Sequence, residues 1–127
     1  MSIHFDKKVI GKDLLDQYGI EKRYKIFRNA YKNDCEQAKA LFIIRFQLKN
    51  MSSKINKIFS LLPMLFLIHF KGFMSKYWLC DDNTNECIGV YCWKSRADAE
   101  RYANGIAVSF MKKRSIKDSV TYEIRDI

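Results

Sequence analysis

The sequence contains few of the residues that interrupt or link regular structure. Only one proline and five glycines occur among its 127 residues, and no segment repeats or is of low complexity. Hydrophobic residues make up 48% of the chain, which excludes a chain that is disordered throughout. A chain of this length is expected to form one domain around a single core.

No apolar run is long enough to predict a membrane span. The longest, Ile58–Phe70, has 13 residues and includes polar ones, whereas a spanning helix needs about 20 apolar residues. The N-terminus is polar, and no apolar stretch typical of a secretion signal follows it. We therefore expect a cytoplasmic protein whose cysteines remain free thiols. These cysteines are Cys35, Cys80, Cys87 and Cys92.

The sequence also lacks the spacings that mark metal and nucleotide sites. It has no C-x-x-C or H-x-x-x-H pair, no P-loop and no glycine-rich dinucleotide motif. We accordingly expect neither a metal nor a cofactor. The net charge is +9, but its basic residues are spread along the chain rather than clustered in one stripe. A solvated basic surface, with no specific nucleic-acid partner, is the favoured interpretation.

Residues 1–39 predict a helical N-terminal extension, separate from a domain at residues 40–127. Ile20, Tyr24, Phe27 and Tyr31 recur at helical spacing and form one apolar stripe. We expect this stripe to pack on the domain or on a partner subunit. An alternative is an arm that docks a partner or a polyanion, because the segment carries a net positive charge.

Residues 40–127 alternate between strand and helix patterns. Apolar and aromatic runs predict strands over 39–49, 73–80, 87–93 and 119–125. Helical spacing predicts helices over 54–70, interrupted by Pro63, and 95–102, capped by Ser95. This order predicts an α+β, ferredoxin-like βαββαβ fold, a four-stranded antiparallel sheet with helices on one face. The other face would stay bare and apolar, which predicts a homodimer through that sheet face.

The most specific motif spans the predicted hairpin. It comprises Lys71–Leu79, the acidic turn Asp81–Glu86, Gly89–Arg96 and Ala99–Tyr102. Over about residues 40–127 the chain resembles the monooxygenase-like branch of the dimeric α+β-barrel superfamily, the antibiotic-biosynthesis-monooxygenase type. The resemblance implies a small-molecule pocket between sheet and helices. Some members of this superfamily oxygenate a phenolic substrate without a cofactor, so the resemblance also implies this activity as an expectation.

Aromatic residues are the candidates for binding a ligand. Period-two alternation places Tyr91 and Trp93 on one face of a strand, and Gly89 leaves space beside them. Packing in the core or in a dimer interface is the alternative interpretation. The complete set of candidate ligand-binding residues is Tyr77, Trp78, Tyr91, Trp93 and Tyr102.

Two basic residues are candidates for catalysis. Arg45 interrupts an apolar strand, so it needs an anionic ligand or a salt bridge, for which Glu123 is one option. His69 is the only histidine in residues 40–127 and is the natural proton acceptor. A solvent-facing role at a helix end is the alternative for His69.

Together these features favour a dimeric protein that binds a small molecule and resembles cofactor-independent monooxygenases. Its substrate would be aromatic or phenolic. The alternative is a non-catalytic ligand-binding or stress-related module on the same scaffold.

Overall fold

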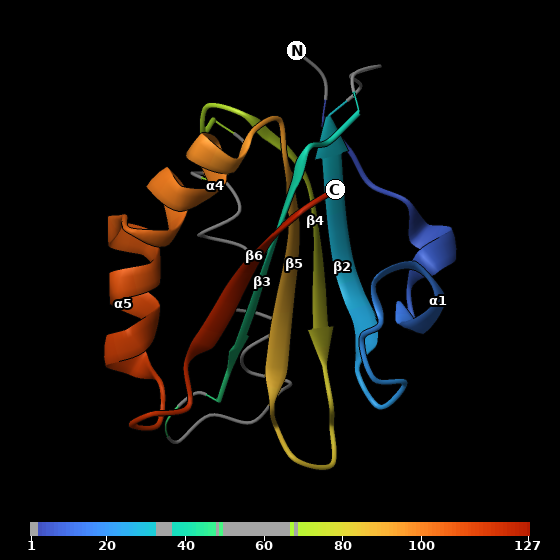
Figure 1. Ribbon diagram of the computed structural model, residues 1–127. Helices are drawn as coiled ribbons and strands as arrows, with labels where there is room; N and C mark the ends of the chain where they lie inside the picture. The colour runs from blue at the N-terminus through green and yellow to red at the C-terminus, as the bar shows by residue number, and fades with distance from the viewer. Residues whose placement is uncertain (1–2, 33–36, 48, 50–66, 68) are drawn as a thin grey trace.

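The computed structural model describes residues 3–32, 37–47, 49, 67 and 69–127. These residues form one six-stranded antiparallel sheet in the order β1-β2-β4-β5-β3-β6. The strands are β1 (Ile3–His4), β2 (Lys25–Lys32), β3 (Ala40–Phe46), β4 (Phe73–Cys80), β5 (Cys87–Trp93) and β6 (Thr121–Asp126). Helices α4 (Arg96–Ala103) and α5 (Ile106–Arg114) lie on one side of the sheet, and the short helix α1 (Leu15–Tyr18) lies on the other (Figure 1).

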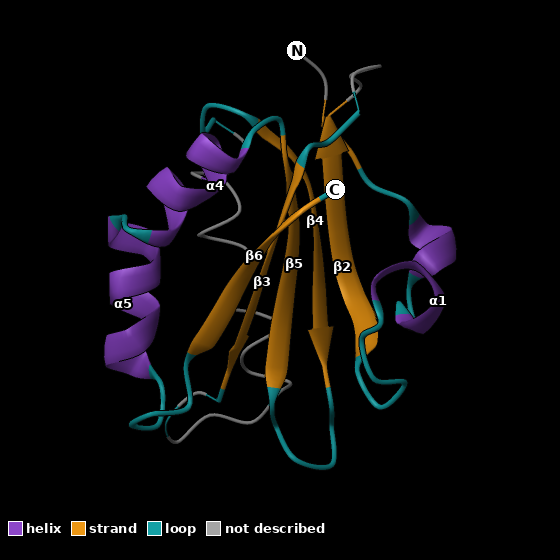
Figure 2. Cartoon of the chain, viewed as in Figure 1, coloured by secondary structure: helices purple, strands orange, loops and turns teal. Residues whose placement is uncertain are grey.

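The predicted α+β, ferredoxin-like fold is confirmed. Its four expected strands form the part of the sheet with the order β4-β5-β3-β6, which is the ferredoxin-like order, while β1 and β2 extend it beyond β4. Figure 2 shows the sheet between the helical layer and the N-terminal segment. The predicted helix over 54–70 falls almost wholly outside the described residues. Among the residues described, no helix is both long and apolar enough to cross a membrane.

The β4–β5 hairpin has the predicted bounds because strand alternation and turn residues agree. Asp81 N donates to Glu86 O at 2.9 Å, and Asn85 takes the left-handed conformation, with φ of 62°. The expectation of free thiols is wrong for Cys80 and Cys87, which form a disulfide. These two residues are direct cross-strand partners with Cα atoms 4.2 Å apart, so the register itself brings their side chains together.

The helical prediction for the N-terminal stripe is wrong, because Lys25–Lys32 is strand β2 and pairs with β4. Only Phe27 and Tyr31 of the stripe lie in this strand, Ile20 and Tyr24 precede it, and the strand contains a β-bulge between Ile26 and Arg28. The bulge moves the following side chains to the other face, so Ile26 packs on one side of the sheet and Ala30 on the other. Buried residues therefore do not alternate regularly along β2.

The second sheet face is covered, so the premise that it stays bare is wrong. Leu14, Ile20 and Tyr24 of the N-terminal segment are at most 4% exposed and pack in one apolar cluster with residues of four central strands. The sheet residues of this cluster are Ile26, Leu41, Ile43, Leu79, Ile88, Val90 and Cys92. The prediction of a homodimer through this face rested on an exposed apolar surface, and this face is covered. The homodimer stays a prediction.

Candidate functional site

Five buried side chains meet between the sheet and α4, and we call them the aromatic site. They are Lys76 and Trp78 of β4, Tyr91 and Trp93 of β5, and Tyr102 of α4, none more than 6% exposed. The Trp93 and Tyr102 ring centroids lie 5.2 Å apart, and the Tyr91 and Tyr102 centroids 5.0 Å apart. Tyr91 and Trp93 are stacked at 6.3 Å. The site therefore presents aromatic rings with several polar tips.

Strand register and one glycine position the sheet side of this site. Lys76 lies opposite Tyr91, and Trp78 lies opposite Gly89. A Cβ at Gly89 would lie 2.8 Å from Tyr91 Cε1 and 3.3 Å from Lys76 Cε. Because real Cβ atoms do not approach so closely, Gly89 makes room for both side chains, as the sequence predicted for the aromatic pair.

Helix α4 supplies Tyr102 because Ser95 fixes where that helix begins. The Ser95 Oγ accepts a hydrogen bond from Asp98 N at 3.1 Å, which is the predicted cap. Seven residues later Tyr102 lies on the same side as Ala99, and both pack on the sheet. Phe42 of β3 contacts the Tyr91 and Tyr102 rings edge-on, at 5.3 Å and 5.8 Å.

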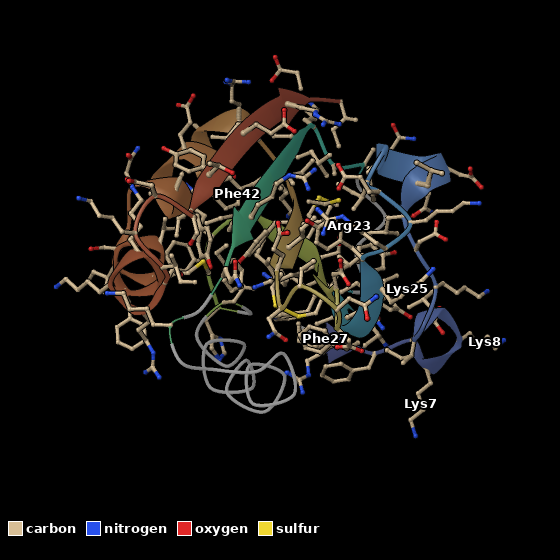
Figure 3. The ribbon with its side chains drawn as sticks, turned by 90° about the horizontal axis from the view of Figure 1, so that it is seen from below. Lys7, Lys8, Arg23, Lys25, Phe27 and Phe42 are labelled. Atoms are coloured by element: carbon tan, nitrogen blue, oxygen red, sulfur yellow. A yellow bond between two sulfur atoms is a disulfide. The ribbon has the colours of Figure 1, made fainter. Side chains whose placement is uncertain are left out.

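The two sides of the sheet differ in chemistry (Figure 3). Phe42 lies on the side of α4 and α5, while Arg23 and Lys25 lie on the side of the N-terminal segment. There, Arg23 pairs with Asp81 at 2.8 Å and Glu86 at 3.3 Å. These ion pairs tie the N-terminal segment to the hairpin.

Lys76 is the site residue that sequence reasoning missed. Its Nζ is hydrogen bonded to Tyr91 Oη at 2.6 Å and lies 4.3 Å from the Trp78 ring centroid. Burial lowers the pKa of the Lys76 amine well below its usual value, and the positive charge of Arg28 lowers it further. The signal was present in the sequence, because Lys76 precedes Trp78 by two residues and must share its face.

The tyrosines remain hydrogen-bond donors over the neutral range. Tyr91 Oη and Tyr102 Oη are 3.1 Å apart. Burial raises the pKa of Tyr91 well above its usual value, and burial also raises the pKa of Tyr102. Beside them, the Trp93 Nε1 is buried and has no hydrogen-bond partner among the described residues. A buried donor without a partner is uncommon, and it remains free to donate to an acceptor atom.

Arg45, Tyr77 and His69 are not part of the aromatic site. Arg45 pairs with Glu21 at 3.0 Å, and not with Glu123, which pairs with Arg125 instead. It also borders a small cavity of about 130 Å³ near β6.

Tyr77 packs against the apolar cluster on the opposite sheet face and lines a cavity of about 220 Å³ between the N-terminal segment and strands β2 and β4. Lys76 also lines this cavity. His69 is exposed in the turn before Phe70, whose ring contacts Tyr102 at 5.3 Å. Catalytic roles for Arg45 and His69 and a ligand-binding role for Tyr77 stay predictions. In the part of the chain that the structure describes, no group of histidine, cysteine or acidic residues could hold a metal ion.

Comparison with known protein families gives a match over most of the chain. The family described as Putative mono-oxygenase ydhR matches residues 41–126, which include all five residues of the aromatic site. No curated protein is significantly similar to the chain.

Several solved structures share the fold. An uncharacterized ferredoxin-fold protein related to antibiotic biosynthesis monooxygenases, from Listeria monocytogenes, has a TM-score of 0.62 at 11% identity over 81% of this chain and 63% of its own. A monooxygenase-like protein from Listeria innocua has a TM-score of 0.63 at 15% identity, over 88% and 66%. An anthrone oxidase-like protein has a TM-score of 0.58 at 11% identity, over 81% and 55%. The chain thus spans less than two thirds of these structures, and such identities establish the fold alone.

Proposed function

Because the chain belongs to the Putative mono-oxygenase ydhR family, we propose that it binds a small aromatic molecule at the aromatic site and oxygenates it without a cofactor. One observation carries this proposal. The unpartnered Trp93 Nε1 lies in a cluster of aromatic rings whose tyrosines also carry polar tips. Such a cluster can stack an aromatic ring and donate hydrogen bonds to its oxygen.

The chemistry proceeds without a bound metal because the substrate itself supplies the electrons. Deprotonation of a phenolic or enolic substrate gives an electron-rich anion that reduces O₂. When a ring CH₂ becomes a carbonyl, two C–H bonds break, one oxygen atom enters the product and the other leaves as water. The protein's part is to remove the proton, to stabilise the oxyanion with fixed donors and to exclude water.

Oxygen uptake with a panel of phenols and anthrone-like compounds tests this proposal. Trp93→Phe keeps a ring but removes the N–H donor, and removal of one oxyanion donor typically costs about 100-fold in turnover. His69→Ala tests the sequence-based prediction that this histidine takes part. Phe110→Ala, an exposed residue of α5, serves as the control. If wild type and Trp93→Phe consume oxygen at the same rate, the site assignment fails.

The alternative function is a non-catalytic ligand-binding module. It is favoured by the mutual hydrogen bonds of Lys76, Tyr91 and Tyr102, which already satisfy one another as core residues do. Saturable binding of a phenol with no oxygen uptake would establish this alternative.

Homodimerisation and a cytoplasmic location remain our predictions for the protein in the cell. The disulfide between Cys80 and Cys87 weighs against a reducing compartment, since disulfides persist mainly in oxidising ones.

A further inference from the structure

The polar groups of the aromatic site are joined in a chain. Lys76 Nζ is 2.6 Å from Tyr91 Oη, which is 3.1 Å from Tyr102 Oη. The chain thus crosses from β4 through β5 to α4. Its last ring lies 5.2 Å from the Trp93 ring, which carries the unpartnered N–H. Among the described residues, no carboxylate forms an ion pair with Lys76.

We propose that this chain is a proton relay, in which Lys76 is the final acceptor of the proton from an acidic phenol or enol bound at the aromatic site. This assignment rests on the proposed function and names its substrate class. The ligand O–H bond breaks, and its proton passes to Tyr102 Oη while Tyr102 passes its own proton to Tyr91 Oη. Tyr91 in turn passes its proton to Lys76 Nζ, where a new N–H bond forms. The ligand keeps the electron pair as an oxyanion, and no electron is transferred.

The buried position of Lys76 sets the direction of this transfer. Burial holds the pKa of Lys76 well below its usual value and the charge of Arg28 of β2 adds to the effect, so the uncharged form of the amine is favoured. An uncharged amine has a lone pair and can accept a proton. Arg28 and Tyr91 are the titratable groups that act on its amine directly, and Tyr102 is hydrogen bonded to Tyr91. Lys76 also lines a cavity whose other titratable residues are Asp6, Tyr31 and Tyr77. Tyr91 and Tyr102 both have raised pKa values, so they pass the proton on rather than hold a negative charge.

The same features select the class of ligand. An aromatic body stacks on the rings, and its oxygen accepts from Trp93 Nε1. The ligand must carry a proton acidic enough for an amine to remove, which excludes simple alcohols. A carboxylic acid is already ionised at neutral pH and brings no proton to transfer. Once formed, the oxyanion and the Lys76 ammonium attract each other strongly in a buried site.

The test uses 4-nitrophenol, whose phenolate is yellow and whose neutral form is colourless. The titration is made with the full chain, one pH unit below the pKa of the free probe. We expect the bound probe to turn yellow in saturable fashion with wild type. Binding of 4-nitroanisole, which has no acidic proton, is measured in parallel.

Three variants isolate the relay. Lys76→Met replaces the amine with an apolar chain of similar length and should reduce the yellow form per bound probe by at least about tenfold, since one pKa unit is a factor of ten. Tyr102→Phe keeps its ring, breaks the relay at the ligand end and should have the same effect. Lys71→Met, at an exposed lysine, should behave as wild type. Binding of 4-nitroanisole should be similar in all four proteins, which also shows that each variant is folded.

The outcomes separate failure of the relay from failure of the proposed function. If Lys76→Met and Tyr102→Phe bind the probe and turn it as yellow as wild type does, the relay is overturned while the aromatic ligand site stands. If equilibrium dialysis finds no binding of either probe to wild type, the proposed function is overturned and the relay with it.

Discussion

Replacing Lys76 with methionine should remove a pH dependence from the stability of the fold. The pKa of Lys76 lies well below its usual value in the folded state. Between that lowered pKa and the pKa of about 10 in the unfolded chain, the unfolded state binds one more proton than the folded state. The free energy of unfolding therefore rises with pH in this window, by about 1.4 kcal/mol for each pH unit. Methionine does not titrate, so this contribution disappears.

Urea unfolding of both proteins at several pH values measures this contribution. Over two pH units within this window, the free energy of unfolding of wild type minus that of Lys76→Met should increase by roughly 2 to 3 kcal/mol as the pH rises. The variant also loses the hydrogen bond to Tyr91, worth about 1 kcal/mol. That loss shifts the whole curve without changing its slope, so the slope is the diagnostic quantity.

Lys71→Met is the matched control, because Lys71 is exposed two residues before β4. It should leave the pH dependence as in wild type. Parallel curves for wild type and Lys76→Met would refute the reasoning, since they would mean that Lys76 is protonated equally in the folded and unfolded states. An amine of that kind could not accept a proton from a ligand near neutral pH.

Three further changes test the fold around the site. Gly89→Ala places a methyl group 2.8 Å from a carbon of a buried tyrosine ring, so thermal unfolding should show a loss of about 1 to 3 kcal/mol. The double change of Cys80 and Cys87 to serine opens a short loop and should cost about 2 kcal/mol in urea unfolding, with equal stabilities arguing that the disulfide does not form in solution. Arg23→Gln should destabilise the fold at neutral pH, and urea curves should converge at acid pH. The reason is that Arg23 lowers the pKa of Asp81 in the folded state. The Arg23–Asp81 ion pair therefore stabilises the fold above the usual aspartate pKa, and this stabilisation is lost as the pH falls through the lowered pKa of Asp81.

The hairpin could be predicted because its local signals agree. Alternation over 73–80 and 87–93 and the turn residues between them all favour the same structure, and Asn85 takes a left-handed conformation in that turn. Strand β2 could not be predicted in the same way. Its bulge breaks the alternation, and only pairing with β4 shows that Ile26 and Ala30 belong to a strand.

The aromatic residues of the site could be predicted from the sequence, whereas its buried lysine was missed. Trp78, Tyr91, Trp93 and Tyr102 were expected to bind a ligand, and the structure brings these four together. Lys76 was not considered because a lysine in a strand usually lies in solvent. Its burial depends on Gly89 in the neighbouring strand, on the Tyr91 hydroxyl and on a helix that begins at Arg96, twenty residues further along. Only the assembled fold places these groups together.

The covered sheet face has a consequence for how the site can work. In a sheet-against-sheet dimer a second copy would occupy the face that Leu14, Ile20 and Tyr24 occupy in this chain. All five residues of the aromatic site come from one chain and lie on the opposite face, so none of them depends on that contact. A dimer formed elsewhere on the protein would leave the relay from Tyr102 to Lys76 intact. Ligand binding at the aromatic site should therefore be independent of protein concentration.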